Sequence, residues 1–257
     1  MSSEAPSDAP SDAPSDAPWL AGVDGCRRGW VVAFVRPSGG DVVVHVVPTF
    51  AEILAAPERP AIVAVDMPIG LPERVGPLGR GPESAVRPLL GQRQSSVFSV
   101  PSRGAIYAHG YGEACRIAAE TSDPPRKMSK QLFMIAPKIR EVDAVLREDA
   151  GAVSRVFEVH PEVAFWRLNG ARALDEPKKM KSRPYEPGLT LRRRLLVNAG
   201  IPDSVACAPA PVGAAADDLI DALACAAIAR RIHRGDARPF PPSYRRDEFG
   251  LPMAIWA

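Results

Sequence analysis

The fold is decided by the stretch WLAGVDGCRRGWVVAFVRPSGGDVVVHVV, residues 19–47, in which apolar runs alternate with short polar connections. Valine and aromatic residues favour strands, so we expect strands over residues 19–25, 29–36 and 41–47. Connections of only a few residues join consecutive strands in an antiparallel arrangement. The sequence therefore predicts an antiparallel meander at the start of the fold.

A different kind of strand follows at residues 61–67, AIVAVDM, where the apolar run is continuous. A continuous run indicates a strand that is covered on both faces, as in parallel sheets. The helix predicted over residues 49–56 supplies a crossover that lets this fourth strand pair parallel to the first. Residues 155–159 are the fifth predicted strand. The predicted fold class is therefore α/β, with a mixed sheet flanked by helices.

Long helical segments separate and follow these strands. Residues 68–152 form a predicted helical insertion between the fourth and fifth strands, and residues 239–257 are predicted to be mostly irregular. We predict one domain over residues 19–257, preceded by a disordered tail at residues 1–18 that repeats Ser-Asp-Ala-Pro. The other predicted helices cover residues 82–90, 105–121, 128–148, 163–168, 189–198 and 214–234. The helix over residues 128–148 has a candidate break at Pro137.

The composition is that of a soluble globular protein. A chain of 257 residues with 46% hydrophobic residues is long enough to bury its own core. Its net charge of +2 implies no general attraction to nucleic acid or membranes, although the arginines cluster locally. No apolar run reaches the roughly 20 residues of a membrane span, and the start of the chain lacks a signal-peptide pattern. The four cysteines form no Cys-x-x-Cys pair, so we expect free thiols and a cytoplasmic location.

Two of the predicted strands carry an acid near their carboxyl ends, Asp24 in the first and Asp66 in the fourth. Parallel pairing of these strands would make the two acids neighbours at one edge of the sheet. Two like charges at that position need a metal ion or a shared proton. The alternatives are a turn role for Asp24 before Gly25 and a capping role for Asp66 before Pro68.

Three more acids begin the helix predicted over residues 214–234, AAADDLIDALACAAIARRIHR. At about 100° per residue, Asp218 and Asp221 share a stripe with small residues, while Asp217 lies on the flank. A buried carboxylate is costly unless it is paired, so we predict that Asp218 and Asp221 are ligands of a cation. Acids in a first helical turn also act as caps, and this role suits Asp217.

The acids lie within a series of motifs: GVDGCRRGW (22–30), DMPIGL (66–71), SSVFSVPSR (95–103), SKQ (129–131), EVHPE (158–162) and DDLIDA (217–222). In content and order this series resembles the DUF429 family of predicted nucleases with an RNase H-like fold. The resemblance covers nearly everything after Trp19. It implies a five-stranded mixed sheet with an acid on the first strand, an acid on the fourth strand and acids on a late helix.

The resemblance also implies a metal centre. The final Asp-x-x-Asp-Ala is similar to that of the Holliday-junction resolvase branch of the superfamily, which gives Asp24, Asp66, Asp218 and Asp221 the metal-binding and catalytic roles. Carboxylates suit Mg²⁺ or Mn²⁺, and two ions about 4 Å apart, bridged by Asp24, would activate a water and stabilise the leaving oxygen. We therefore expect a metal-dependent nuclease whose partner is DNA or RNA.

A second set of polar residues is expected around these acids. Glu158 and His160, at the end of the fifth strand, are candidate catalytic residues, and His160 is a candidate general base; a histidine before proline also serves as a structural group. Arg103, Lys130 and Arg93, in the insertion, are candidates for binding substrate phosphates. Solvated surface charge is the alternative for each of these cations.

Two other functions fit the same sequence. The first is a protein that binds nucleic acid or a nucleotide without cutting it, for which the basic runs at residues 178–183 and 192–194 would track a phosphate backbone. The second is an actin-like phosphotransferase, because Asp24-Gly25 after a first strand also resembles the phosphate turn of that superfamily. An aromatic content of 6% argues against a single-strand stacking platform.

Overall fold

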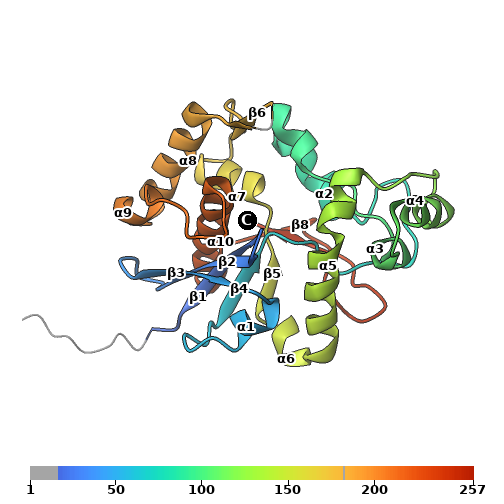
Figure 1. Cartoon of the computed structure of the whole chain (residues 1–257), viewed down its shortest axis with the longest axis horizontal. Helices are drawn as coiled ribbons and strands as arrows, with labels where there is room; N and C mark the ends of the chain where they lie inside the picture. The colour runs from blue at the N-terminus through green and yellow to red at the C-terminus, as the bar shows by residue number, and fades with distance from the viewer. Residues whose placement is uncertain (1–16, 182) are drawn as a thin grey trace, which may run out of the picture.

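The structure is a computed structural model that describes residues 17–181 and 183–257 (Figure 1). Residues 1–16, which make up most of the predicted Ser-Asp-Ala-Pro tail, lie outside the described residues. The sheet and helices described below therefore belong to the chain that follows this tail.

The sheet begins with the predicted antiparallel meander, β1 (Leu20–Cys26), β2 (Gly29–Val35) and β3 (Val42–Val47). As predicted, β4 (Ile62–Val65) pairs parallel to β1, and β5 (Val156–Glu158) continues the sheet parallel to β4. The predicted α/β class with a mixed sheet is confirmed.

Two short strands in the C-terminal segment extend the sheet further. β9 (Ile255–Trp256) pairs with β5, and β8 (Pro239–Phe240) pairs with β9, so the sheet has seven strands in the order β3-β2-β1-β4-β5-β9-β8. The predicted number of five strands is wrong. Strands of two residues are too short to show an alternating pattern, so no local pattern in the sequence predicts their pairing.

The predicted insertion between β4 and β5 is helical. Its longest helix runs without interruption through Pro137. The single helix predicted over residues 105–121 is instead two helices, because the chain is extended at Ala108 and Gly110. The helices of the insertion are α2 (Pro82–Val86), α3 (Arg103–Tyr107), α4 (Tyr111–Glu120), α5 (Lys130–Glu148) and α6 (Ala150–Val153), with 3₁₀ turns at Arg87–Leu89 and Gly91–Ser96.

The remaining elements are α1 (Phe50–Leu54), α7 (Pro161–Leu168), β6 (Lys179–Met180), β7 (Arg183–Pro184), α8 (Glu186–Asn198), α9 (Asp203–Ala206) and α10 (Ala216–His233).

Helices cover both faces of the sheet. One apolar core joins α7, α8 and α10 to one face, and a second joins α1, α3, α4 and α5 to the other. Figure 1 shows α10 and α5 on opposite sides of the sheet.

Helix α10 packs closely on β1 because Gly22 has no side chain. A Cβ atom at Gly22 would lie 2.0 Å from the backbone nitrogen of Ala226 and 2.2 Å from the carbonyl oxygen of Ala222. The helix is buried on nearly all sides, and even Arg230 near its end is buried and donates to the carbonyls of Arg36 and Gly200. The buried surface of α10 is thus wider than the predicted stripe.

Two predictions from composition can be compared directly with the structure. All four cysteines are free thiols, as expected. In the part of the chain that the structure describes, none of the helices combines the length and hydropathy that a membrane span requires.

Candidate metal centre

The candidate site begins where two parallel strands end. Asp24 lies in β1, and Asp66 directly follows β4. In the register of these strands Val23 pairs with Val65, so the two acids form the next pair along the sheet. The backbone N–H of Asp66 donates to the Val23 carbonyl at 2.9 Å. The predicted meeting of Asp24 and Asp66 at one edge of the sheet is confirmed.

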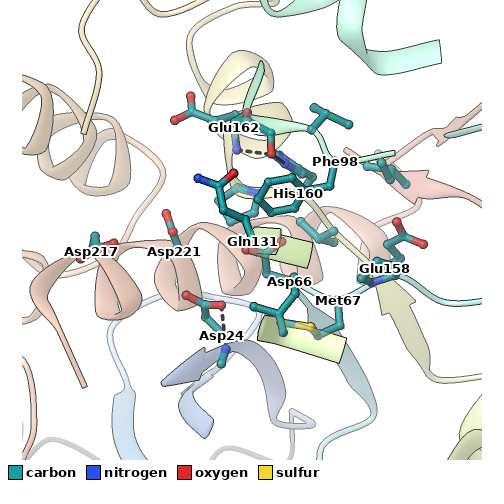
Figure 2. A pocket seen from close by; sticks show the side chains of 18 of the residues that line it. Asp24, Asp66, Met67, Phe98, Gln131, Glu158, His160, Glu162, Asp217 and Asp221 are labelled. Carbon is teal, nitrogen blue, oxygen red and sulfur yellow. Dashed lines mark hydrogen bonds between the residues drawn. The ribbon is translucent and has the colours of Figure 1, made fainter. Parts of the chain in front are cut away.

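Helix α10 brings a third acid, Asp221, to the same edge. Asp24, Asp66 and Asp221 each offer a carboxylate oxygen, and these three atoms lie within 4.8 Å of one another. Figure 2 shows the three side chains coming from β1, from the end of β4 and from α10. The close approach of α10 at Gly22 makes this arrangement possible, because it sets the distance between helix and strand one helical turn from Asp221.

The contacts of these carboxylates leave oxygens for a ligand. Asp24 Oδ1 accepts a hydrogen bond from the Gly25 N–H at 2.6 Å, and Asp221 Oδ2 pairs with Lys178 Nζ. Asp221 Oδ1 is buried and has no hydrogen-bond partner among the described residues. A buried polar atom without a partner is costly, so this oxygen marks a position where a cation or a proton would be stabilised.

Burial raises the pKa of all three acids, and repulsion within the group adds to this at Asp24 and Asp66. Burial is the main cause at Asp24, followed by the charges of Asp66 and Asp221. Burial is also the main cause at Asp66, followed by the charge of Asp221. Burial raises the pKa of Asp221 to about 6, although the Lys178 ammonium opposes this. The fully ionised cluster is therefore strained without a further positive charge.

The acids lie in a cavity of about 750 Å³. The insertion supplies another wall, to which Phe98 and Gln131 belong (Figure 2). The apolar Met134 and the polar Lys138 line the cavity as well. Such a mixture of apolar surface and a few converging polar groups is typical of ligand sites. The cavity has the volume of a small-molecule pocket.

Asp217 and Asp218 both make contacts that differ from those predicted for them. Asp218 accepts a hydrogen bond from the Ala215 N–H at 2.8 Å, so Asp218 is the cap of α10 and the prediction that Asp217 is the cap is wrong. The third residue of a helix points back toward the N-cap, which explains this contact. Asp217 is buried and pairs with Lys179 at 2.6 Å. Asp218 lines the cavity, but the structure does not bring it into the group of three acids.

Glu158 is bound by Arg80 instead of facing the three acids. Its Oε1 accepts from Arg80 at 2.7 Å, and its Oε2 accepts from Arg80 at 3.0 Å and from the Ile69 N–H at 2.8 Å. Arg80 is fully buried and also pairs with Glu83 at 2.7 Å. This network holds the segment that follows Asp66. The geometry therefore supports a positioning role for Glu158, and its predicted catalytic role stays a prediction.

Replacing Glu158 by glutamine separates these two roles. Glu158→Gln is expected to lower the free energy of unfolding by about 2 to 3 kcal/mol, because Arg80 loses a charged partner in a buried place. Urea denaturation of the metal-free protein measures this loss. The control is Glu120→Gln, which removes an exposed pair with Arg116 and is expected to cost less than about 1 kcal/mol. A Glu158→Gln variant as stable as the parent, yet inactive, would instead support catalysis by Glu158.

His160 has the contacts of a structural group. It is the N-cap residue of α7, where its Nδ1 accepts from the Glu162 N–H at 3.2 Å. Its Nε2 lies 3.3 Å from the Ser96 carbonyl oxygen, so the contacts assign the proton of a neutral ring to Nε2. Burial lowers the pKa of His160, although Glu162 opposes this. Both ring nitrogens are thus in use, as the structural alternative predicts.

The three predicted phosphate-binding cations lie in different places. Arg93 lines the cavity. Lys130 is exposed at the start of α5 and does not line the cavity. Arg103 is held away from the site by Asp143 and by Asp247, the latter at 2.6 Å. Of these three cations, the structure therefore brings Arg93 to the cavity that the acids line.

Two lysines that the sequence did not single out contact the acids. Lys178 pairs with Asp221, and Lys179 pairs with Asp217. Burial would lower the pKa of Lys178, but the three acids outweigh burial and raise it. The basic run at residues 178–183 signalled the presence of these lysines. No local pattern in the sequence connected these lysines to the acids, because Lys178 and Asp221 are 43 residues apart in the chain.

The donor atoms fit a hard divalent cation. Carboxylate oxygens are the usual protein ligands of Mg²⁺ and Mn²⁺, and no histidine or cysteine belongs to the group of three. The buried Asp221 Oδ1 without a partner fits the same conclusion. The three residues that would hold the ion are Asp24, Asp66 and Asp221.

Comparison with known proteins identifies the family. A family model described as "Protein of unknown function (DUF429)" matches residues 22–246, which contain the three acids and nearly the whole sheet. No curated protein and no solved structure matches the chain. The match covers most of the chain and confirms the resemblance seen in the sequence motifs. The protein therefore belongs to the DUF429 family.

Proposed function

We propose that the protein is a metal-dependent nuclease that hydrolyses phosphodiester bonds with Mg²⁺ or Mn²⁺. The observation that carries the proposal is the buried group of Asp24, Asp66 and Asp221, whose carboxylate oxygens lie within 4.8 Å of one another beside a cavity. Acids at this spacing repel one another, and a divalent ion would remove the repulsion. Sites that bind and cleave phosphodiesters commonly use such ions.

An RNase H-like fold is part of the proposal. The first five strands stand in the order β3-β2-β1-β4-β5, with a helical insertion before β5. Acids lie on β1, at the end of β4 and on a late helix, which are the positions that the resemblance implied. This agreement supports the fold assignment.

The residues of this chain would divide the work of hydrolysis. Asp24, Asp66 and Asp221 would hold the ion, which when bound would polarise a phosphoryl oxygen and promote ionisation of a water. Arg93 and Lys138 lie on the cavity wall and would attract the phosphate backbone. The apolar part of the wall would accept a base or a sugar.

The cavity supports a substrate with an unpaired or distorted segment. Apolar groups such as Phe98 and Met134 face the same space as the acids, so one nucleotide and its phosphate could enter together. The cytoplasmic location stays a prediction.

The test is a cleavage assay with defined DNA and RNA substrates, including single strands, duplexes and junctions, with Mn²⁺ and with EDTA. We expect cleavage with Mn²⁺ and none with EDTA. Binding of nucleic acid that EDTA does not alter, without cleavage of any substrate, would support the non-cleaving alternative. Tight ATP binding would support the phosphotransferase alternative, although the described residues form one large sheet and one two-stranded hairpin rather than two similar domains.

The stabilising effect of Mn²⁺ is expected to increase with pH. An aspartate in an unfolded chain has a pKa near 3.9, and the folded protein raises this value at all three acids, to about 6 at Asp221. Protonation therefore stabilises the folded metal-free protein at low pH, and this contribution is lost as pH rises from about 4 through 6 and above. Mn²⁺ competes with the same protons.

Thermal unfolding at pH 5 and pH 7.5, with and without Mn²⁺, measures this effect. The charged groups that act on Asp221 are Lys178 from the loop before β6, Glu162 from α7 and Asp217 from α10, and Asp24 and Asp66 lie beside it. We expect the metal-free midpoint to fall toward pH 7.5 and the rise caused by Mn²⁺ to be larger there. A rise caused by Mn²⁺ that is equal at both pH values would contradict metal binding by the buried acids.

A further inference from the structure

A lysine from a distant loop occupies one side of the acid group. Lys178 precedes β6, and its Nζ contacts Asp221 Oδ2. The Lys178 side chain is 27% exposed, so it lies at the rim of the site and faces the cavity. The ammonium of a surface lysine is normally surrounded by water, whereas that of Lys178 forms an ion pair with a buried carboxylate.

The backbone around Lys178 is fixed by buried groups. The fully buried Arg192 donates to the Glu176 carbonyl at 2.9 Å. Gly188, in the first turn of α8, packs so closely on the loop that a Cβ atom there would lie 1.9 Å from the Pro177 carbonyl oxygen. Lys178 is therefore a positioned cation, because the residues just before it are held by α8.

Other acids near the site already have their own cations. Asp217 pairs with Lys179 at 2.6 Å, and Glu162 pairs with Arg192 at 2.6 Å. Within residues 17–181 and 183–257, Lys178 is the cation that forms an ion pair with the group of three acids. The charge that remains in the group is thus that of three carboxylates and one ammonium.

The free carboxylate oxygens favour a single divalent ion. Lys178 engages one oxygen of Asp221, and the Gly25 N–H engages one oxygen of Asp24. In the described part of the chain, the Asp66 side chain alone among the three accepts no hydrogen bond. A carboxylate that bridges two ions offers one oxygen to each ion. If Asp24 bridged two ions, one of them would compete with the Gly25 N–H for Asp24 Oδ1.

We propose that Lys178 is the fixed second cation of this centre, so that Asp24, Asp66 and Asp221 take one divalent ion and the Lys178 ammonium faces the phosphate beside it. This inference rests on the proposed function. Two positive charges from the ion and one from Lys178 balance the three carboxylates. An ammonium is a good partner for a phosphate oxygen, and it needs no further ligands from the protein.

The first test is a titration with Mn²⁺ followed by electron paramagnetic resonance. We expect one Mn²⁺ per chain at saturation, with the spectrum of an isolated ion. Two Mn²⁺ per chain with a spin-coupled spectrum would overturn the inference and leave the nuclease proposal standing. One bound Mn²⁺ without cleavage of any substrate would refute the nuclease proposal alone, and no bound Mn²⁺ would refute both.

The second test replaces the lysine. Lys178→Met is expected to bind Mn²⁺ about tenfold more tightly than the parent, because the ion no longer competes with an ammonium for Asp221. The same variant should cleave more slowly, whereas Lys178→Arg, which keeps the charge, should resemble the parent in Mn²⁺ affinity. The control is Lys179→Met, whose lysine pairs with Asp217, and its Mn²⁺ affinity should change less than about threefold. Unchanged or weaker Mn²⁺ binding by Lys178→Met would overturn the inference.

Discussion

The Asp24→Asn variant is expected to lose Mn²⁺-dependent cleavage by about a thousandfold and yet to be more stable than the parent without metal. Asparagine keeps the shape of the side chain and the oxygen that accepts from the Gly25 N–H. It removes one of three neighbouring carboxylate charges, and repulsion among these acids raises the pKa of Asp24 and of Asp66. We expect a gain of about 1 to 2 kcal/mol in the metal-free free energy of unfolding.

Three measurements on the same protein preparation check this expectation. They are the rate of cleavage with Mn²⁺, the free energy of unfolding in urea with EDTA, and the rise of the thermal midpoint on adding Mn²⁺. The matched control is Asp236→Asn, which changes an exposed acid paired with Arg234 and should leave all three measurements near the parent values. An Asp24→Asn variant that cleaves as fast as the parent would refute the proposed site.

Gly22→Ala is expected to prevent stable folding, with a loss of at least about 4 kcal/mol in the free energy of unfolding. The added methyl would overlap backbone atoms of α10, 2.0 Å from the nitrogen of Ala226. Backbone atoms cannot move aside as a flexible side chain can, so the helix must separate from β1. Any folded fraction should bind Mn²⁺ weakly, because α10 carries Asp221.

Circular dichroism and urea denaturation of the purified variant measure this loss. The control is Gly112→Ala in the first turn of α4, where a Cβ atom meets nothing within 4 Å. Alanine favours helices over glycine, so this variant should be unchanged or more stable by up to about 1 kcal/mol. A Gly22→Ala protein with parental stability would mean that α10 lies farther from β1 than the structure places it.

Local patterns predicted the parts of this fold that depend on neighbours in the chain. The meander at residues 19–47 and the parallel strand at residues 61–67 follow from apolar periodicity and short turns. The pairing of Asp24 with Asp66 follows as well, because parallel neighbours end at the same edge. These predictions needed only the rules of strand pairing.

Other features depend on contacts that no local pattern reveals. Arg103 was expected at the site, but the buried acids Asp143 and Asp247 hold it elsewhere. Asp218 was expected as a ligand, but it turns back to cap its own helix at Ala215. A polar side chain can reach several partners, and the tertiary structure decides which of them lies within its reach.

By itself, the sequence determined the order of the main strands, the helical insertion and the acids at the ends of two strands, because each of these is a property of a short segment and its period. Only the tertiary structure decided which acid of α10 joins the group, that Lys178 reaches it, and that two C-terminal strands complete the sheet. These results depend on how closely α10 and α8 pack on their neighbours at Gly22 and Gly188. Such distances are set by the whole core rather than by any one segment.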